Sequence, residues 1–456
     1  MYRQNAWKKY DASLEKNVMK FADGYIDFLS KAKTERLAVK EAVKLLNARG
    51  YKNADEVKSA KSGDKLYFIN KNKNICAFKV GKEPLTYGLR ILGAHIDSPR
   101  MDFKEHPLYE KNGFVYGDTH YYGGIKKYQW VTIPLALHGV VCKKDGSTVE
   151  INIGEDPKDP VVGISDLLIH LSADQLTKPG AKVIEGENLD VTLGSKPLKG
   201  EESHAVKANI LKLLKKKYGI DEEDLVSSEI EVVPAGPARS YGLDESMVAG
   251  YGQDDRSCAY SSLLAFLDNE DDEHNACCVL VDKEEIGSVG ATGAKSLFFE
   301  NVIARLLELE GEKDVVWAAR KVLQNSKMLS SDVSSAFDPL YASAFDTNNV
   351  AYLGNGLVFN KYTGARGKSG ANDANPEYYA WVRKAMDDNN VNWQSSEIGK
   401  VDQGGGGTIA YILGDYNMNV IDAGIPLIGM HAPMEVISKA DLYEAYLGYK
   451  AFLGAK

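Results

Sequence analysis

The stretch LRILGAHIDSP, residues 89–99, places a short apolar run directly before a histidine and an aspartate. The run from Leu89 to Ala94 has the length of a buried strand, and it delivers His95 at its carboxyl end. Asp97 follows two positions later, near enough to orient the imidazole ring of His95. Loops that follow buried strands are where open α/β sheets place their sites. The stretch therefore predicts a functional site at one edge of an α/β sheet.

The segments on either side of this stretch extend the α/β pattern. Apolar positions at helical spacing within residues 11–48 predict two helices, and short apolar runs at 65–70 and 75–80 predict strands. After about residue 239 the alternation of strand and helix returns. The expected strands there are 276–282, 327–331 and 419–423, and the expected helices are 259–267, 293–299, 302–309 and 439–452.

The middle of the chain has a different character. Residues 99–237 show alternating apolar and polar positions with glycine and proline punctuation, and one lysine-rich helix is expected at 205–218. We interpret this stretch as an inserted β-rich domain. Residues 1–98 and 238–456 then form one discontinuous α/β domain, for which three layers, α/β/α, around a mixed central sheet are the simplest architecture.

Bulk composition excludes several classes of function. The chain has 456 residues, 44% hydrophobic and 26% charged, which is typical of a globular protein. A net charge of -9 argues against a nucleic-acid partner, because phosphate binding needs a concentrated basic surface. No apolar run is long enough for a membrane span. The five cysteines include no C-x-x-C pair, which favours a reducing cytoplasm over a disulfide framework.

Three further segments place acids or a histidine after a predicted strand or at the start of a helix. These are YGQDDRS at 251–257, VLVDKEEIGSVGATGAK at 279–295 and GIPLIGMHAPMEV at 424–436. Each has an ordinary structural interpretation on its own, as a helix start, a solvent-facing pair of acids or a hydrogen-bonded histidine. The glycines of the second segment lack the spacing and the Lys-Ser/Thr ending of a nucleotide-binding loop.

Taken together, the four segments supply the nitrogen and oxygen ligands that a pair of zinc-like ions requires. A carboxylate that bridges two ions about 3.5 to 4 Å apart lets both lower the pKa of a shared water. A carboxylate that is not a ligand can then take the proton of that water and pass it to a leaving amine. Glu284 suits this task, because its neighbour Glu285 is the expected ligand.

The motifs GAHIDSPR, GQDDRSCAY, DKEEIGSVGATG, LSSDVSSAFDPLY and GMHAPMEV occur in this order. They resemble those of the M18 metallopeptidases, the aspartyl aminopeptidase and aminopeptidase I family, from about residue 15 to the C-terminus. The resemblance implies a metal-dependent aminopeptidase that acts on peptides, with a zinc-exopeptidase-like catalytic domain and two divalent ions, zinc or else cobalt or manganese. Its implied metal ligands are His95, Asp255 as the bridge, Glu285, Asp332 and His431, with His95 and Asp332 at separate metal sites.

The resemblance also assigns Glu284 as the general base and Asp97 as the residue that holds the His95 ring. In this family the inserted domain pairs subunits, and twelve chains form a tetrahedral shell in which a neighbour's histidine reaches the active site. His170 in LLIHLS resembles that histidine, although a polar residue in a half-buried strand is the alternative. Gly405 and Gly406, in the glycine loop 402–408, are the expected substrate-binding backbone.

The chain departs from the family pattern at two motifs. Where the family reads G-R-L-D-N, this chain reads G-Q-D-D-R, so Asp254 remains a rival to Asp255 as the bridge. After Asp332 the chain carries Ser335 and Asp338 where eukaryotic members commonly carry histidine. An additional acid near the pocket would repel an acidic side chain, so we expect a broader or non-acidic preference for the substrate's first residue.

Two other functions remain open from the sequence. One is a different co-catalytic zinc exopeptidase of the same fold, which peptides blocked at either terminus would separate from an aminopeptidase. The other is a non-catalytic assembly protein, whose sequence should have lost a ligand or the base. All the expected positions carry chemically competent residues, which favours the enzyme.

Overall fold

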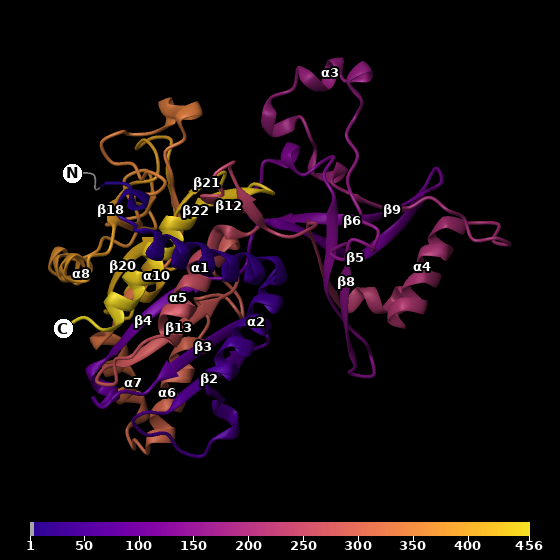
Figure 1. Cartoon of the computed structure of the whole chain (residues 1–456). Coiled ribbons are helices and arrows are strands. Elements are labelled where there is room, and N and C mark those ends of the chain that lie inside the picture. Colours follow the sequence, from indigo (N-terminus) through magenta and orange to yellow (C-terminus); the bar gives the residue numbers. More distant parts are fainter. Residues whose placement is uncertain (1–3) are drawn as a thin grey trace. The chain divides into compact units, whose positions relative to one another are not determined.

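The computed structural model of the chain describes residues 4–456, which form two compact units (Figure 1). Unit 1 contains residues 4–97, 238–430 and 435–456, and unit 2 contains residues 98–237 together with the short segment 431–434. The chain therefore leaves unit 1 after Asp97 and returns to it at Ala238.

Unit 1 is built on a nine-stranded sheet whose central strands are short, mostly apolar runs. β4 is its centre, with β13 and β14 parallel to it on either side, and β20 parallel to β14. Towards one edge, β3 is antiparallel to both β13 and β2, and β1 is parallel to β2. Towards the other edge, β16 is antiparallel to β20 and parallel to β18. In spatial order the strands are β1 (Lys52–Asn53), β2 (Lys65–Asn70), β3 (Asn74–Lys79), β13 (Asn275–Val281), β4 (Leu89–His95), β14 (Lys327–Ser330), β20 (Asn419–Gly424), β16 (Leu357–Asn360) and β18 (Trp393–Ser395).

Alternate residues of the central strands enter two different hydrophobic clusters, because successive side chains of a strand point to opposite faces. In β13, Cys278 and Leu280 belong to one cluster, whereas Cys277 and Val279 belong to the other. Helices of the first cluster are α1 (Ala12–Lys31), α2 (Glu35–Ala48), α5 (Gln253–Leu267), α8 (Pro376–Asp388) and α10 (Lys439–Leu453). Those of the second are α6 (Phe298–Glu310), α7 (Val315–Asn325) and α9 (Ala410–Gly414).

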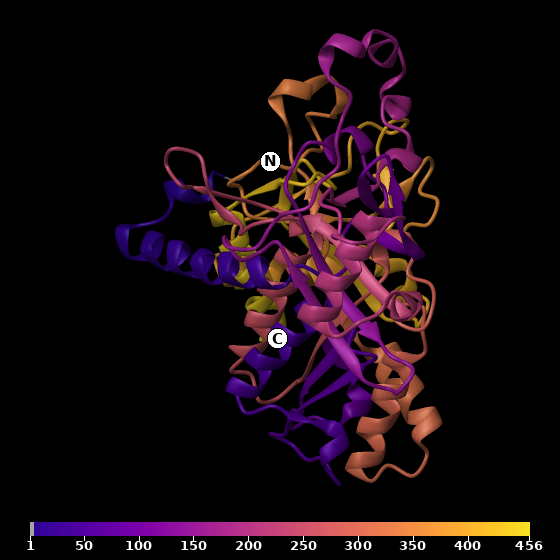
Figure 2. The same cartoon turned by 90° about the vertical axis from the view of Figure 1, so that its right-hand side faces the viewer.

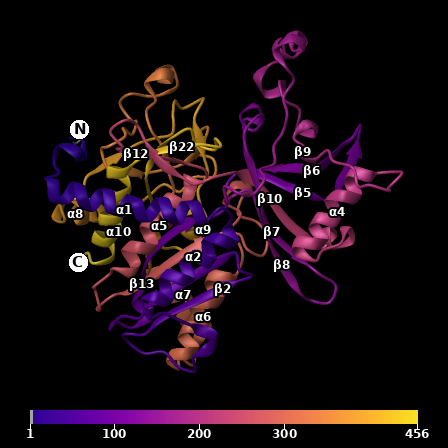
Figure 3. The same ribbon diagram turned by 45° about the vertical axis from the view of Figure 1, so that its right-hand side comes forward.

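Aromatic side chains hold α1 against α5 and α10, which run beside it in Figures 1 and 3. The ring of Phe21 on α1 lies 5.4 Å from the ring of Tyr260 on α5 and 4.7 Å from that of Tyr446 on α10, measured between centroids. Such pairs add about 0.5–1.5 kcal/mol beyond the area they bury. On the other face, the salmon-coloured helices α6 and α7 lie next to each other in Figure 2.

Two smaller sheets complete unit 1. They contain parts of the segments 424–436 and 402–408, in which the sequence predicted site residues. A five-stranded sheet is ordered β11 (Arg239–Tyr241), β12 (Met247–Gly250), β22 (Glu435–Ser438), β21 (Pro426–Ile428) and β15 (Ser334–Ser335). A two-stranded ribbon joins β17 (Gly364–Ala365) to β19 (Gly405–Gly406).

Unit 2 contains a six-stranded sheet in which every neighbouring pair is antiparallel (Figure 3). In spatial order its strands are β8 (Thr148–Ile153), β7 (Leu135–Cys142), β10 (Ser228–Pro234), β5 (Arg100–Lys111), β6 (Phe114–Tyr122) and β9 (Val191–Gly194). The lysine-rich helix expected at 205–218 is α4 (Ala205–Tyr218), and the short helix α3 spans Ala173–Leu176.

One predicted helix is wrong. Residues 293–299 were expected to be helical, but the chain turns through residues 287–297 and the helix α6 begins only at Phe298. The Cβ of any side chain at Gly293 would lie 2.2 Å from the carbonyl oxygen of Ser288, so this glycine permits a tight backbone approach. Among the residues that the structure describes, no helix is long and apolar enough to cross a membrane.

Candidate metal centre

His95 ends the central strand β4 and is almost completely buried. Its Nδ1 lies 3.1 Å from the carbonyl oxygen of Asp97 and 3.3 Å from the Asp97 carboxylate, so Nδ1–H has an acceptor in either group. Its Nε2 lies 3.2 Å from Oδ1 of Asp254. With the proton on Nδ1, Nε2 and the Asp254 oxygen are two electron-pair donors facing each other, an arrangement that a metal ion would satisfy.

The two adjacent aspartates occupy different positions in the first turn of α5. Neither has helical backbone angles, and the peptide bond that joins them is cis. Asp254 donates its backbone N–H to Oε2 of Glu435 on β22, 3.1 Å away, while its carboxylate lies beside the ring of His95. Asp255 is fully buried, and its Oδ2 accepts a hydrogen bond from the backbone N–H of His95 at 3.3 Å.

Glu284 and Glu285 follow β13 in a single turn of 3-10 helix, Glu284–Ile286. Lys283, the residue before this turn, has a left-handed backbone at φ 70°. The backbone N–H groups of both glutamates donate to the buried carboxylate of Asp97, at 3.1 and 3.2 Å. Oε2 of Glu284 lies 4.0 Å from Nε2 of His95. Asp97 therefore touches both the histidine ring and the backbone of the glutamate turn.

Several of the predicted ligands converge within unit 1. Ligand atoms of His95, Asp254 and Asp332 all lie within 4.8 Å of one another, and those of His95, Glu284 and Glu285 form a second such group. Asp332 follows β14, the strand beside β4. His95 and Asp332 therefore share one cluster of ligand atoms. It is Asp254, and not Asp255, that belongs to this cluster.

The electrostatics of the cluster also favour a bound cation. Burial raises the pKa values of the Asp255 and Asp332 carboxyl groups well above their usual range. Repulsion from Asp254 adds to the shift of Asp255, and repulsion from Asp255 adds to that of Asp332. Burial alone would lower the pKa of His95, but hydrogen bonds to Asp254 and Asp97 outweigh it and raise that pKa well above its usual value. Buried acids that crowd one histidine lose this repulsion when a metal ion neutralises them.

The remaining predicted site residues lie in loops or short turns. His431 has a left-handed backbone at φ 67°, and its Nδ1 lies 2.8 Å from the carbonyl oxygen of Gly124 within unit 2. His170 is exposed and belongs to the 3-10 turn Ile169–Leu171, so the half-buried strand considered as its alternative does not form. Gly405 and Gly406 form β19 of the two-stranded ribbon.

One residue near the cluster was missed by the sequence interpretation. Asp422 lies in β20 beside Ser330 of β14, and its side chain is fully buried. Burial raises its pKa to about 7, the hydroxyls of Thr408 and Ser330 oppose this shift, and the charge of Glu284 adds to it. The available signal was a single acid inside the apolar strand NVIDAG at 419–424.

Comparison with known proteins extends the likeness over nearly the whole chain. The model of the aminopeptidase I zinc metalloprotease (M18) family matches residues 28–453. A probable M18 family aminopeptidase 1 from Clostridium acetobutylicum is 56% identical over 455 residues, covering 99% of this chain and 98% of the relative.

Solved structures show the same likeness in three dimensions. The crystal structure of an M18-family aminopeptidase from Thermotoga maritima has a TM-score of 0.97 at 45% identity and covers 100% of both chains. The S. cerevisiae mApe1 dodecamer has a TM-score of 0.76 at 21% identity, over 94% of this chain and 95% of that one, and so shares the fold. The family match and the likeness to the Clostridium relative show that this chain belongs to the aminopeptidase I zinc metalloprotease (M18) family.

Proposed function

We propose that this chain is an aminopeptidase that removes N-terminal residues from peptides, using water activated by two divalent ions. The observation that carries the proposal is the convergence of His95, Asp254, Asp332, Glu284 and Glu285 around the ends of three neighbouring strands. Buried and half-buried nitrogen and carboxylate donors at this spacing suit zinc-like ions. Membership of a zinc metalloprotease family makes zinc the first choice, while the same donors also accept cobalt or manganese.

The ligand assignment that we favour uses Asp254 as the bridging carboxylate. His95 and Asp332 complete one site with it, because their ligand atoms lie within 4.8 Å of one another. Glu285 and His431 are proposed for the second site. His431 precedes Glu435 by four residues in the sequence, and the Glu435 carboxylate accepts a hydrogen bond from the backbone N–H of Asp254. Asp255 then has a supporting role, because its carboxylate accepts a hydrogen bond from the backbone N–H of His95.

Glu284 is the proposed general base. When bound, the metal ions supply Lewis acidity and lower the pKa of water. Glu284 would take a proton from a water molecule at this cluster and would deliver it to the nitrogen of the leaving amine. Asp97 is a positioning residue, since it accepts both glutamate N–H groups and lies against Nδ1 of His95. The domain that carries these residues is proposed to be the three-layer catalytic domain, comprising residues 1–98 and 238–456.

Substitution of the base is the direct test. A Glu284→Gln protein should bind its two metal ions as the wild type does, because the amide keeps the shape of the side chain, and should lose about 10²–10⁴-fold in kcat. Metal content by elemental analysis and hydrolysis of a leucine anilide measure the two quantities. Exposed Glu270 gives the matched control, Glu270→Gln, which should behave as the wild type. Full turnover in Glu284→Gln would remove this residue from the mechanism, and cleavage of N-terminally blocked peptides would favour another exopeptidase class.

Substrate preference is proposed to be broad or non-acidic. Asp338, half-buried where eukaryotic members commonly have a histidine, and buried Asp422 beside Ser330 both disfavour an acidic side chain nearby. Gly405 and Gly406 are the proposed backbone donors to the peptide. Leucine and lysine anilides should be hydrolysed at least as fast as aspartate and glutamate anilides. A strong preference for the acidic pair would overturn the proposal.

Unit 2 is the proposed dimerisation domain of a tetrahedral dodecamer, and His170 the residue that completes a neighbour's active site. Large exposed apolar side chains lie close to His170 in the sequence of unit 2, which supports this proposal. Leu167, Leu168, Ile169, Leu171 and Leu176 are 47–68% exposed. The S. cerevisiae mApe1 dodecamer supports an assembly of twelve subunits. All five cysteines are free thiols, which supports the cytoplasm as the proposed compartment.

A further inference from the structure

A polar pocket, separate from the candidate metal centre, lies in unit 1 at the amino ends of the central strands. It has a volume of ≈ 370 Å³, which falls within the range of small-ligand sites, about 300–1,000 Å³. Glu83, Tyr87, Arg90, His274, Asn325 and Lys327 are among the residues that line it. Arg90 and His95 are five residues apart on β4, so roughly 16 Å of strand separates this pocket from the metal centre.

Two cations stand side by side in the pocket. Arg90 on β4 and Lys327 on β14 are register partners in the parallel pairing, so their side chains leave the same face of the sheet. Both lie over the ring of Trp381, with the guanidinium carbon at 5.8 Å and the ammonium nitrogen at 5.3 Å from its centroid. Like charges held this close repel each other, and a ligand anion between them would relieve that repulsion.

Both cations have N–H groups that can donate hydrogen bonds to a ligand. Arg90 is only 8% exposed, and its hydrogen bonds to the carbonyl oxygens of Leu453 and Phe452 use Nη1 alone, at 2.7 and 3.5 Å. The ammonium of Lys327 has no hydrogen-bond acceptor or carboxylate partner within residues 4–456. Burial lowers the pKa of Lys327, and the charge of Arg90 lowers it further. Nε and Nη2 of Arg90 and Nζ of Lys327 are therefore available to a ligand.

The opposite charge comes from the acidic side of the pocket. Glu83 lines the pocket and its carboxylate has no partner in the described structure, while the Asp271 carboxylate lies 3.9 Å from Nη1 of Arg90. With Arg90 and Lys327, this gives two cations and two carboxylates. Glu83 would repel a plain anion, and the two cations would repel a plain cation. A ligand that carries both charges satisfies both sides.

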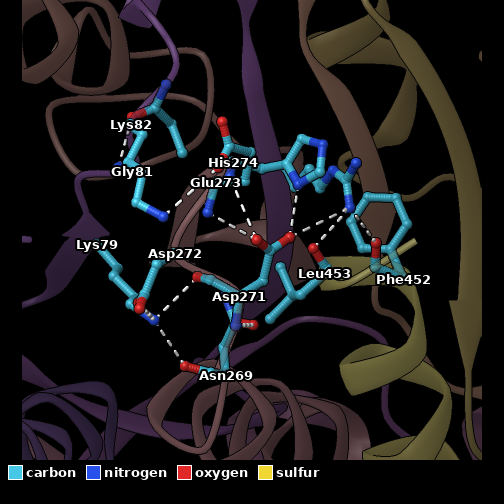
Figure 4. Close-up of polar contacts among 12 residues, drawn as sticks. Lys79, Gly81, Lys82, Asn269, Asp271, Asp272, Glu273, His274, Phe452 and Leu453 are labelled. Carbon is cyan, nitrogen blue, oxygen red and sulfur yellow. Dashed lines mark hydrogen bonds and ion pairs between the residues drawn. The ribbon is translucent and has the colours of Figure 1, made fainter. Parts of the chain in front are cut away.

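The loop that supplies His274 and Asp271 is firmly anchored (Figure 4). Nδ1 of His274 lies 2.5 Å from the Asp271 carboxylate, which leaves Nε2 without a partner among the described side chains. Lys79 donates to the carbonyl oxygens of Asn269 and Asp271, at 2.9 Å each, and pairs with Asp272 at 2.7 Å. The pocket wall is therefore already ordered before a ligand binds, which lowers the entropy cost of binding.

We propose that this pocket binds a free α-amino acid as its zwitterion. The α-carboxylate lies between Arg90 and Lys327, and the α-ammonium group pairs with Glu83. The geometry of the pocket does not depend on the proposed function. The ligand class rests on the proposed function, because an aminopeptidase releases free α-amino acids. The pocket is then a product-binding site at the opposite end of β4 and β14 from the metal centre.

Calorimetric titration of the full-length, metal-loaded protein with L-leucine tests this proposal, with acetohydroxamate present to occupy the metal centre. We expect Lys327→Gln and Glu83→Gln each to weaken leucine binding at least 10-fold, and Lys327→Arg to restore most of it. Exposed Lys321 on α7 also lies over a tryptophan, so Lys321→Gln is the matched control and should bind as the wild type does. Acetate and ethylammonium, each with one charge only, should bind at least 10-fold more weakly than leucine.

Three results would overturn the proposal: no leucine binding to the wild type, binding that neither Lys327→Gln nor Glu83→Gln changes, or acetate binding as tightly as leucine. The last result would make the pocket a simple anion site. Thermal unfolding of each variant shows whether it has folded. Hydrolysis of leucine anilide by the same preparations, without acetohydroxamate, tests the proposed function separately, so a failure of one is distinguishable from a failure of the other.

Discussion

At the scale of single residues, the adjacent acids Asp254 and Asp255 illustrate what a sequence motif can and cannot specify. The motif predicts that a carboxylate lies near His95, since the segment starts a helix beside the strand end. Which acid faces the ring depends on backbone angles that no local pattern encodes. In the structure Asp254 reaches the ring, whereas Asp255 accepts from the backbone N–H of His95.

Asp422 makes a testable contribution to the pH dependence of stability. Its pKa is about 7 in the folded protein and near 3.8 when unfolded, so the folded state holds the proton over this interval. The stability that the group contributes is complete below the unfolded pKa and is lost as the pH rises through about 7. Between pH 5 and 8 the wild type should therefore lose roughly 2–3 kcal/mol more unfolding free energy than Asp422→Asn.

Urea unfolding of the two proteins at pH 5 and pH 8 measures this difference. An Asp422→Asn protein whose stability changes with pH as steeply as the wild type would contradict the burial argument. Asp415 lies at the end of α9 on the same chain segment, and Asp415→Asn is a suitable control, for which the wild-type pH dependence should persist.

At the scale of elements, the strands were the most predictable part of the fold. The runs at 65–70 and 89–94 are apolar, bounded by turn residues and too short for helices, and they form β2 and β4 within one residue of the predicted bounds. The failure at 293–299 has a physical cause. Its apolar residues mimic a helical period, but the turns around Gly290 and Gly293 bring backbone segments together, and this depends on tertiary packing.

Gly424 shows how closely two elements approach at the candidate metal centre. A Cβ at this last residue of β20 would lie 1.7 Å from the carbonyl oxygen of Asp332. Gly424→Ala must therefore displace the backbone that carries Asp332. We expect reduced metal content and a loss of about 100-fold in kcat/KM, the scale of effect of a misplacement near 1 Å.

Elemental analysis and leucine anilide hydrolysis would check the Gly424→Ala effect. A Cβ at Gly180 meets nothing within 4 Å, so Gly180→Ala is the control and should match the wild type. Circular dichroism distinguishes a local displacement from global unfolding. Wild-type metal content and activity in Gly424→Ala would show that β20 and the Asp332 loop can separate without consequence.

At the scale of the whole molecule, the exposed apolar turn of unit 2 is the segment through which we propose that assembly affects activity. Ile169 and Leu171 are each 68% exposed in the single chain, on either side of His170. If this turn lies in a subunit interface, Ile169→Glu with Leu171→Glu should place two charges in an apolar contact and reduce the size of the particle. Light scattering and sedimentation measure that size, and activity should fall with it.

A matched surface change separates assembly from general solubility. Leu213 of α4 is 53% exposed away from this turn, and Leu213→Glu should leave the particle size unchanged. If His170 completes the site of a neighbouring subunit, as proposed, a His170→Ala protein should keep its size and lose activity. Wild-type size in the double variant would exclude this turn from the interface.

The order of the strands around β4 has a consequence for synthesis of the protein. Residues 89–95 pair on one edge with residues 275–281 and on the other with residues 327–330. During translation the emerging apolar strand must therefore wait, with both edges unpaired, until more than half of the polypeptide has left the ribosome. Unpaired apolar strands of this kind promote aggregation. Strand pairs between residues so distant in sequence also form slowly. Folding yield in the cell should therefore depend on how well chaperones shield this single strand.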